Sequence, residues 1–136
     1  MKAKDNEIIL IYNSEKQKDK EVLGYAKSIK DHKLNETDIS KSMLTERQIA
    51  EIASDLDKKI EEMVEASHAK YKTIIKDKSF SEEELLKLLK ENPELLKTPV
   101  AYIDKKVFMV NSQYELINEG LEIEGVKSQE ANKFEK

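Results

Sequence analysis

Side chains that commonly carry out chemistry are scarce in this sequence. Its 136 residues include no cysteine, two histidines and a single arginine, Arg47. Without a thiol the chain can form no disulfide, no thiolate nucleophile and no cysteine-based metal site. His32 and His68 stand apart, with no carboxylate at a recurring metal-ligand spacing, which favours surface positions over a metal site. Any anion would have to be bound by lysine, since a bidentate guanidinium is available at one position at most.

Charge and hydropathy exclude several classes of partner. Charged residues make up 38% of the chain and the net charge is -4, with lysine and glutamate interspersed. No basic stripe forms that could neutralise a phosphate backbone, so we expect no direct binding to nucleic acid. The apolar run at residues 8–12 is far shorter than a membrane span or a signal-peptide core. We therefore expect a cytoplasmic protein without membrane contact.

The first third of the chain predicts a strand, a helix and a second strand. Residues 8–12 are a continuous run of β-branched, leucine and tyrosine side chains, which is typical of a strand buried on both faces. Apolar residues recur at helical spacing from 22 to 29, which predicts an amphipathic helix that ends near His32. Residues 34–39 predict a second, weaker strand.

Two capping boxes mark the beginnings of later helices. Thr45 and Gln48 have the Thr-x-x-Gln form, and Ser81 and Glu84 have the equivalent Ser-x-x-Glu form. The helix after Ser81 is rich in leucine and is expected to end at Asn92, because proline follows.

The remaining segments complete the order of elements. Residues 57–78 predict two shorter helices with a break near residues 67–68. The apolar runs 99–103 and 107–110 predict an antiparallel hairpin, and Ser112 is expected to cap a last helix. We predict a single domain over residues 1–124 and a flexible tail over residues 125–136.

Two segments of the sequence resemble the arsenate reductase (ArsC)/Spx family. Residues 80–100 are similar to its signature of a leucine-rich helix, an Asn-Pro or His-Pro break and a strand that begins at a proline. Residues 11–14, Ile-Tyr-Asn-Ser, resemble the end of the family's first strand, which leads to a nucleophilic cysteine. The similarity extends over residues 7–119. It implies an α/β, thioredoxin-like fold, with a mixed four-stranded sheet and a helical insertion between strands 2 and 3.

The resemblance also shows what this chain has lost. The family's cysteine position corresponds to Gln17, and the second cysteine of its Cys-x-x-Cys members falls near Lys20. Its anion-binding arginines fall at Thr98 and near Asn111 and Glu65. A reactive thiolate needs neighbouring cations that lower its pKa, so the thiol and the arginines lose their purpose together. Arsenate reduction is therefore excluded, and we expect no catalytic residue, no metal and no resident cofactor.

A degenerate ligand site is the alternative that the resemblance implies. Its candidate residues are Asn13, Ser14, Gln17, Lys20, Thr98 and Pro99. In thioredoxin-like folds a cis proline leaves backbone groups free to pair with a peptide such as glutathione, and the first helix turn attracts anions. The simpler readings are that Asn13 or Ser14 caps the helix and that Pro99 only begins a strand. The sequence does not decide the isomer of the Thr98–Pro99 bond.

Three functional hypotheses follow from these residues. The first is a catalytically inactive ArsC/Spx-like binding or regulatory module, whose partner is a protein or a small anionic or peptidic ligand. The Spx branch offers a model, because its members bind RNA polymerase. The second is a thiol-free enzyme of the thioredoxin fold that uses glutathione through Thr98–Pro99 together with Tyr12, Ser14 or Lys20. The third is a structural subunit.

Overall fold

A computed structural model describes residues 1–111. Its elements are β1 Glu7–Tyr12, α1 Gln17–Lys27, β2 Lys33–Asp38, α2 Glu46–Asp55, η1 Ile60–Met63, α3 Ala69–Ile74, α4 Glu82–Glu91, η2 Pro93–Leu95, β3 Val100–Ile103 and β4 Lys106–Met109. The helix expected after Ser112 and the tail at 125–136 lie outside the described residues. The single domain over residues 1–124 therefore stays a prediction.

The chain divides into two compact units. The sheet unit contains residues 2–37 and the described residues from Thr98 onward, and it carries the strands and α1. The helical unit contains Met1 and residues 38–97, with α2, α3 and α4. This insertion of helices between β2 and β3 is the one that the sequence predicts.

The sheet is mixed and four-stranded, in the order β2-β1-β3-β4. β1 pairs antiparallel with β3, with Ile8 opposite Ile103, and β3 pairs antiparallel with β4 through a tight turn at Asp104. Asp104 has a φ of 54°, the left-handed conformation that Asp tolerates better than most residues. The predicted α/β class and sheet are confirmed.

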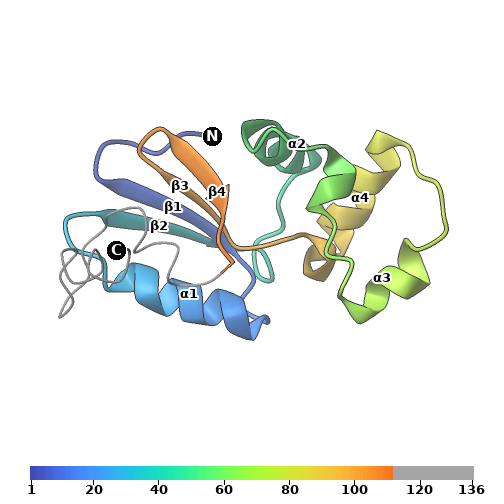
Figure 1. Ribbon diagram of the computed structural model, residues 1–136, viewed down its shortest axis with the longest axis horizontal. Helices are drawn as coiled ribbons and strands as arrows, with labels where there is room; N and C mark the ends of the chain where they lie inside the picture. Colours follow the sequence, from blue (N-terminus) through green and yellow to red (C-terminus); the bar gives the residue numbers. More distant parts are fainter. Residues whose placement is uncertain (112–136) are drawn as a thin grey trace, which may run out of the picture. The chain divides into compact units, whose positions relative to one another are not determined.

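Helix α1 packs along one face of the sheet (Figure 1). Its apolar side is at Val22, Ala26 and, just beyond the helix, Ile29, and all three are buried. The strand residues of the same core are Ile8, Leu10, Tyr12, Ala101 and Ile103. Burial of these side chains fixes α1 against β1, and so fixes the loop that joins them.

The helical unit is built on two capped amphipathic helices. Both predicted capping boxes form: the Thr45 hydroxyl accepts from Gln48 N–H at 3.0 Å, and the Ser81 hydroxyl accepts from Glu84 N–H at 3.1 Å. The buried apolar residues of this unit include Ile49, Ile52 and Ala53 from α2 and Leu85 and Leu89 from α4. None of the helices described in residues 1–111 is long and apolar enough to cross a membrane.

Two element predictions need correction. Helix α1 ends at Lys27, before His32, because the N–H groups of Ser28 and Ile29 turn back to carbonyls three residues earlier. Of the two helices expected in residues 57–78, the first is only the single 3₁₀ turn η1, and the second is α3.

Candidate functional site

The loop between β1 and α1 is shaped by Asn13. The Asn13 side-chain oxygen accepts from Glu15 N–H at 2.9 Å, and its carbonyl accepts from Lys16 N–H at 3.0 Å. This is a turn stabilised by a side chain that hydrogen-bonds its own backbone two residues on. The helix cap is Lys16, whose side chain makes no capping hydrogen bond, so the expectation that Asn13 or Ser14 caps α1 is wrong.

A buried carboxylate, Asp19, lies at the third position of α1. The side chain is 0% exposed. Its Oδ2 accepts the backbone N–H of Asn13 at 2.8 Å and the hydroxyl of Thr98 at 2.5 Å. Asp19 thus joins the loop after β1 to the segment that leads into β3, 79 residues further along the chain.

Asp19 is the functional candidate that the sequence analysis missed. In the sequence it lies among Lys16, Lys18 and Lys20, and an acidic residue in such a segment is expected on a solvated surface of mixed charge. One signal was available: Asp19 lies three residues before Val22, so it extends the buried side of α1 back by one turn.

The second half of the predicted site is the Thr98–Pro99 segment. The bond between these residues is cis, which the sequence left undecided. Thr98 is 3% exposed, and its hydroxyl is bonded to Asp19. The Pro99 carbonyl accepts from Val110 N–H at 2.9 Å. Both residues are buried, and these polar groups are bonded within the sheet unit.

The other predicted site residues lie on the surface of the loop. Gln17 and Lys20 are exposed, and the Gln17 amide donates to the Glu21 carboxylate one turn further along α1. Ser14 is half-buried. The structure therefore brings Asn13 and Thr98 together through Asp19, whereas it leaves Gln17 and Lys20 facing solvent. A ligand at these six residues stays a prediction.

The positions that correspond to the family's other arginines carry no cation. Asn111 is exposed, and the half-buried Glu65 accepts a hydrogen bond from the Ser67 hydroxyl at 2.7 Å. Within residues 1–111 no three His, Asp or Glu side chains gather closely enough to hold a metal ion.

A hollow of about 750 Å³ opens in the helical unit, and the sequence analysis did not anticipate it. It is bounded by α2, the segment from Asp57 through η1, and the first turns of α4. The apolar lining residues are Ala50, Ala53, Ile60, Phe80 and Leu85. The charged lining residues are Asp57, Lys58, Lys59, Glu61, Glu62 and Glu82. Each of these six charged residues is exposed, so the charges surround a partly apolar floor.

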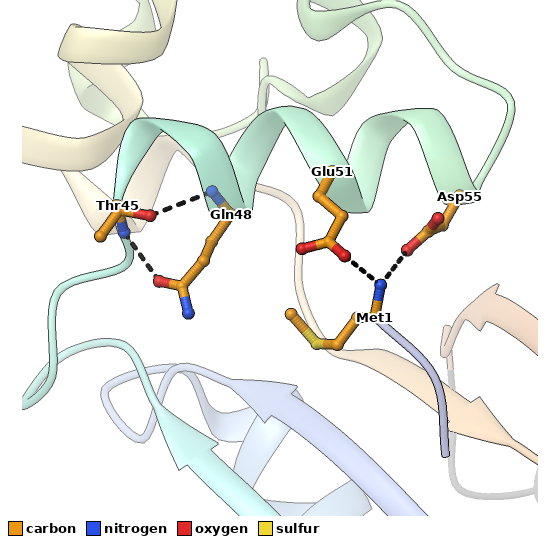
Figure 2. Close-up of polar contacts among 5 residues, drawn as sticks. All are labelled: Met1, Thr45, Gln48, Glu51 and Asp55. Atoms are coloured by element: carbon orange, nitrogen blue, oxygen red, sulfur yellow. Dashed lines mark hydrogen bonds and ion pairs between the residues drawn. The ribbon is translucent and has the colours of Figure 1, made fainter.

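Helix α2 also carries a pair of carboxylates that holds an amine. Figure 2 shows the Met1 amine bonded to Glu51 and to Asp55, one turn apart on the same side of α2. The hydrogen bond that the Met1 amine donates to Glu51 raises the pKa of that amine above its ordinary value of 8.0, against a smaller opposing effect of burial.

Solved structures show which fold this arrangement represents. A Yersinia pestis protein proposed to be an arsenate reductase aligns with a TM-score of 0.71 at 15% identity, over 82% of this chain and 98% of its own. An arsenate reductase from Vibrio cholerae aligns with a TM-score of 0.71 at 13% identity, over 85% and 98%. A Staphylococcus aureus protein solved by NMR aligns with a TM-score of 0.61 at 21% identity, over 80% and 96%.

These likenesses show that the chain has the fold of the arsenate reductases over most of its length. No family model and no curated protein matches its sequence. The fold is therefore the part of the resemblance that the comparisons support. The resemblance in sequence places the family's cysteine at Gln17, and because the chain contains no cysteine, that thiol chemistry has no nucleophile here.

Proposed function

We propose that this protein is a catalytically inactive, ArsC-like binding module, and that its ligand is a segment of another protein. A role of the Spx kind, in which the fold binds a protein and turns over no substrate, is the form that this proposal takes. The expected cytoplasmic location belongs to the same proposal. The observation that supports this binding role is a contrast between two regions. The loop after β1 is filled by its own side chains, whereas the hollow in the helical unit is open.

The loop offers little to a small ligand. Of its polar groups, Asn13, Asp19 and Thr98 are at most 3% exposed and are bonded to one another. Gln17 is exposed but has no nucleophilic or ionisable atom. A glutathione or anion site would have to displace these hydrogen bonds, and each buried partner left unpaired would cost about 1–3 kcal/mol.

The hollow has the composition that suits a peptide side chain. Its lining combines apolar and polar surface, and its volume falls within the range of about 300–1,000 Å³ that is usual for ligand pockets. Its rim carries four carboxylates, from Asp57, Glu61, Glu62 and Glu82, against two lysines. The excess of two negative charges favours a basic segment.

The proposed ligand is therefore a segment with one apolar anchor and flanking lysine or arginine. The anchor would bury apolar area against residues such as Ile60, Phe80 and Leu85, which supplies affinity. The basic residues would meet the acidic rim, which supplies association rate and orientation.

Peptide selection tests this proposal directly. A random peptide library displayed on phage would be panned against the purified protein, and we expect enrichment of peptides that combine lysine or arginine with leucine or an aromatic residue. Glu82 lines the hollow, whereas Glu83 does not, and both are exposed in the first turn of α4. E82K should weaken the selected peptides by roughly tenfold, about 1.4 kcal/mol, and E83K should leave them nearly unchanged.

Two results would overturn the proposal. One is a selection without enrichment, or with enrichment of acidic peptides. The other is an equal loss of binding in E82K and E83K, because these variants place the same charge beside the same helix terminus and differ only in whether the residue lines the hollow.

A further inference from the structure

Helix α3 differs from the other two helices of the helical unit because it buries none of its own side chains. It contains six residues, Ala69–Ile74, and no residue in it is buried. A helix of this length is marginal on its own in water, so other bonds must hold it. The His68 ring accepts the N–H of Lys70 at 3.1 Å, and the Lys70 ammonium donates to the Glu94 carboxylate at 2.6 Å. A cap and an ion pair therefore hold α3 in place, and none of its side chains is fully covered.

The segment that contains α3 is the most basic part of the chain. Residues 69–78 include four lysines and one aspartate, an excess of three positive charges, and no ten-residue stretch outside them has an excess above two. Lys72 and Lys76 are exposed, and their side chains form no hydrogen bond or ion pair with the residues that the structure describes. Tyr71 follows Lys70 directly and is half-buried, so part of it remains accessible. This segment therefore presents an aromatic residue between lysines.

These properties match the hollow of the same unit. The ligand proposed for the hollow has an apolar anchor and flanking basic residues, and Lys70-Tyr71-Lys72 has that composition. The rim of the hollow carries an excess of two negative charges. No residue of α3 lines the hollow of its own chain, so both surfaces are offered to a neighbouring molecule. Their opposite charges favour association between two molecules.

We propose that α3 of a second copy of this chain occupies the hollow, so that the protein associates with itself through its helical unit. The inference rests on the proposed function, because it uses the same hollow and the same ligand chemistry, and it adds the identity of one occupant. Tyr71 supplies the apolar anchor against residues such as Ile60 and Phe80. Lys72 and Lys76 meet the carboxylates of the rim. Self-association therefore competes with any other basic segment for the hollow.

Sedimentation velocity over a range of concentrations tests the proposal on the full chain. We expect the average mass of the parent protein to rise with concentration, and to rise less at high salt, since salt screens exposed charges. K72E reverses a charge on α3, and E82K reverses one that lines the hollow. Each should weaken self-association by roughly tenfold or more. K87E and E83K reverse charges at exposed positions of α4 that do not line the hollow, so they should leave self-association nearly unchanged.

A mixture of two variants identifies the surfaces that meet. The contact joins unlike surfaces, and each copy carries both of them. K72E keeps an intact hollow and E82K keeps an intact α3, so one complete contact can form between them. We expect the mixture to associate with an affinity near that of the parent contact, although each variant alone associates weakly. Both variants remain net negative, since each substitution changes the parent charge of -4 by two, so general attraction between them does not produce this result.

Three outcomes would overturn the proposal. A parent protein that sediments as a monomer at every concentration would show that the two surfaces do not pair. Equal association by K72E, E82K and their two controls would place the contact elsewhere on the molecule. A mixture of K72E and E82K that associates no better than its components would show that α3 and the hollow do not bind each other.

The experiments also separate this inference from the proposed function. If selected peptides bind a monomeric parent protein and E82K weakens them, self-association is overturned and the proposed function stands. If self-association meets all the expectations above and no basic peptide is enriched, the proposed ligand from another protein is overturned, and a second copy stands as the occupant of the hollow.

Discussion

The loop around Asp19 buries its polar groups, whereas the hollow of the helical unit exposes them. In the loop, Asn13, Asp19 and Thr98 are buried and bonded to one another. In the hollow, the carboxylates and lysines are exposed around an apolar floor. Buried polar groups that satisfy one another fix a structure, whereas exposed charges beside apolar surface remain free to meet a partner.

The two regions belong to one fold and use their polar groups differently. The loop offers no thiol nucleophile, and the Asp19 carboxylate lies in the first turn of α1. The helical insertion carries the open hollow. One chain can therefore combine an open hollow in its helical unit with a loop whose polar groups are buried.

The largest expected effect tests whether the floor of the hollow is held by apolar burial. Leu89 is 1% exposed and does not line the hollow, whereas Leu85, one turn earlier on α4, is 8% exposed and does. Leu89→Ala should lower the free energy of unfolding by about 2–5 kcal/mol. Leu85→Ala should cost less, because the space it leaves joins an existing hollow. Urea unfolding of both variants measures the difference. Equal losses would contradict the view that the hollow is open beside Leu85.

The next effect tests whether the loop is held by polar bonds. Thr98→Val keeps the shape of the side chain but removes the hydroxyl that donates to the Asp19 carboxylate. Hydrogen bonds to charged groups contribute about 1.5–3 kcal/mol, so the free energy of unfolding should fall by that amount. Thr98→Ser keeps the hydroxyl and is the control for lost packing.

A matched change in the hollow sharpens this comparison. Ser54 lines the hollow and is exposed, so Ser54→Ala removes a hydroxyl that is open to water. It should change the free energy of unfolding by less than about 0.5 kcal/mol. If Ser54→Ala cost as much as Thr98→Val, the two regions would not differ in how they use polar groups.

Local patterns were sufficient to predict most of the fold. The strand at residues 8–12 and the capping boxes at Thr45 and Ser81 depend on neighbours within four residues, and all three formed. The mixed four-stranded sheet and its helical insertion followed from a resemblance that covers most of the chain. The 3₁₀ turn η1 was overestimated as a helix, because apolar residues at helical spacing do not reveal where a helix stops.

The burial of Asp19 and the hollow of the helical unit both depend on distant contacts. The burial of Asp19 is linked to Thr98, 79 residues away, and spacing within Lys16–Lys20 could not reveal this partner. The hollow depends on how α2, η1 and α4 pack, and no sequence motif specifies that packing. Sequence reasoning proposed Asn13 and Thr98 as site residues, but it did not find the carboxylate that links them.

The smallest expected effect concerns the two capping boxes of the helical unit, which differ in the side chain that closes them. In α2 the box is closed by Gln48, a neutral amide, and in α4 it is closed by the Glu84 carboxylate. The Ser81 backbone N–H, and then its hydroxyl, hold the pKa of Glu84 below the ordinary value of 4.5. Since the folded pKa is the lower one, the contribution of Glu84 to stability is present above pH 4.5 and is lost as the pH falls through the folded pKa. The box at Thr45 has no titrating group.

A reciprocal exchange of these residues measures the difference. Glu84→Gln should make the melting temperature less sensitive to acid, and Gln48→Glu should make it more sensitive, because each variant gives one helix the closing group of the other. Thr45→Ala sets the scale at neutral pH, with an expected loss of about 1 kcal/mol for a capping residue. If the melting temperatures of the parent protein, Glu84→Gln and Gln48→Glu fell in parallel between pH 7 and strong acid, the acid sensitivity could not be assigned to Glu84. A change confined to Glu84→Gln would show that the surroundings of α4, and not the carboxylate alone, lower that pKa.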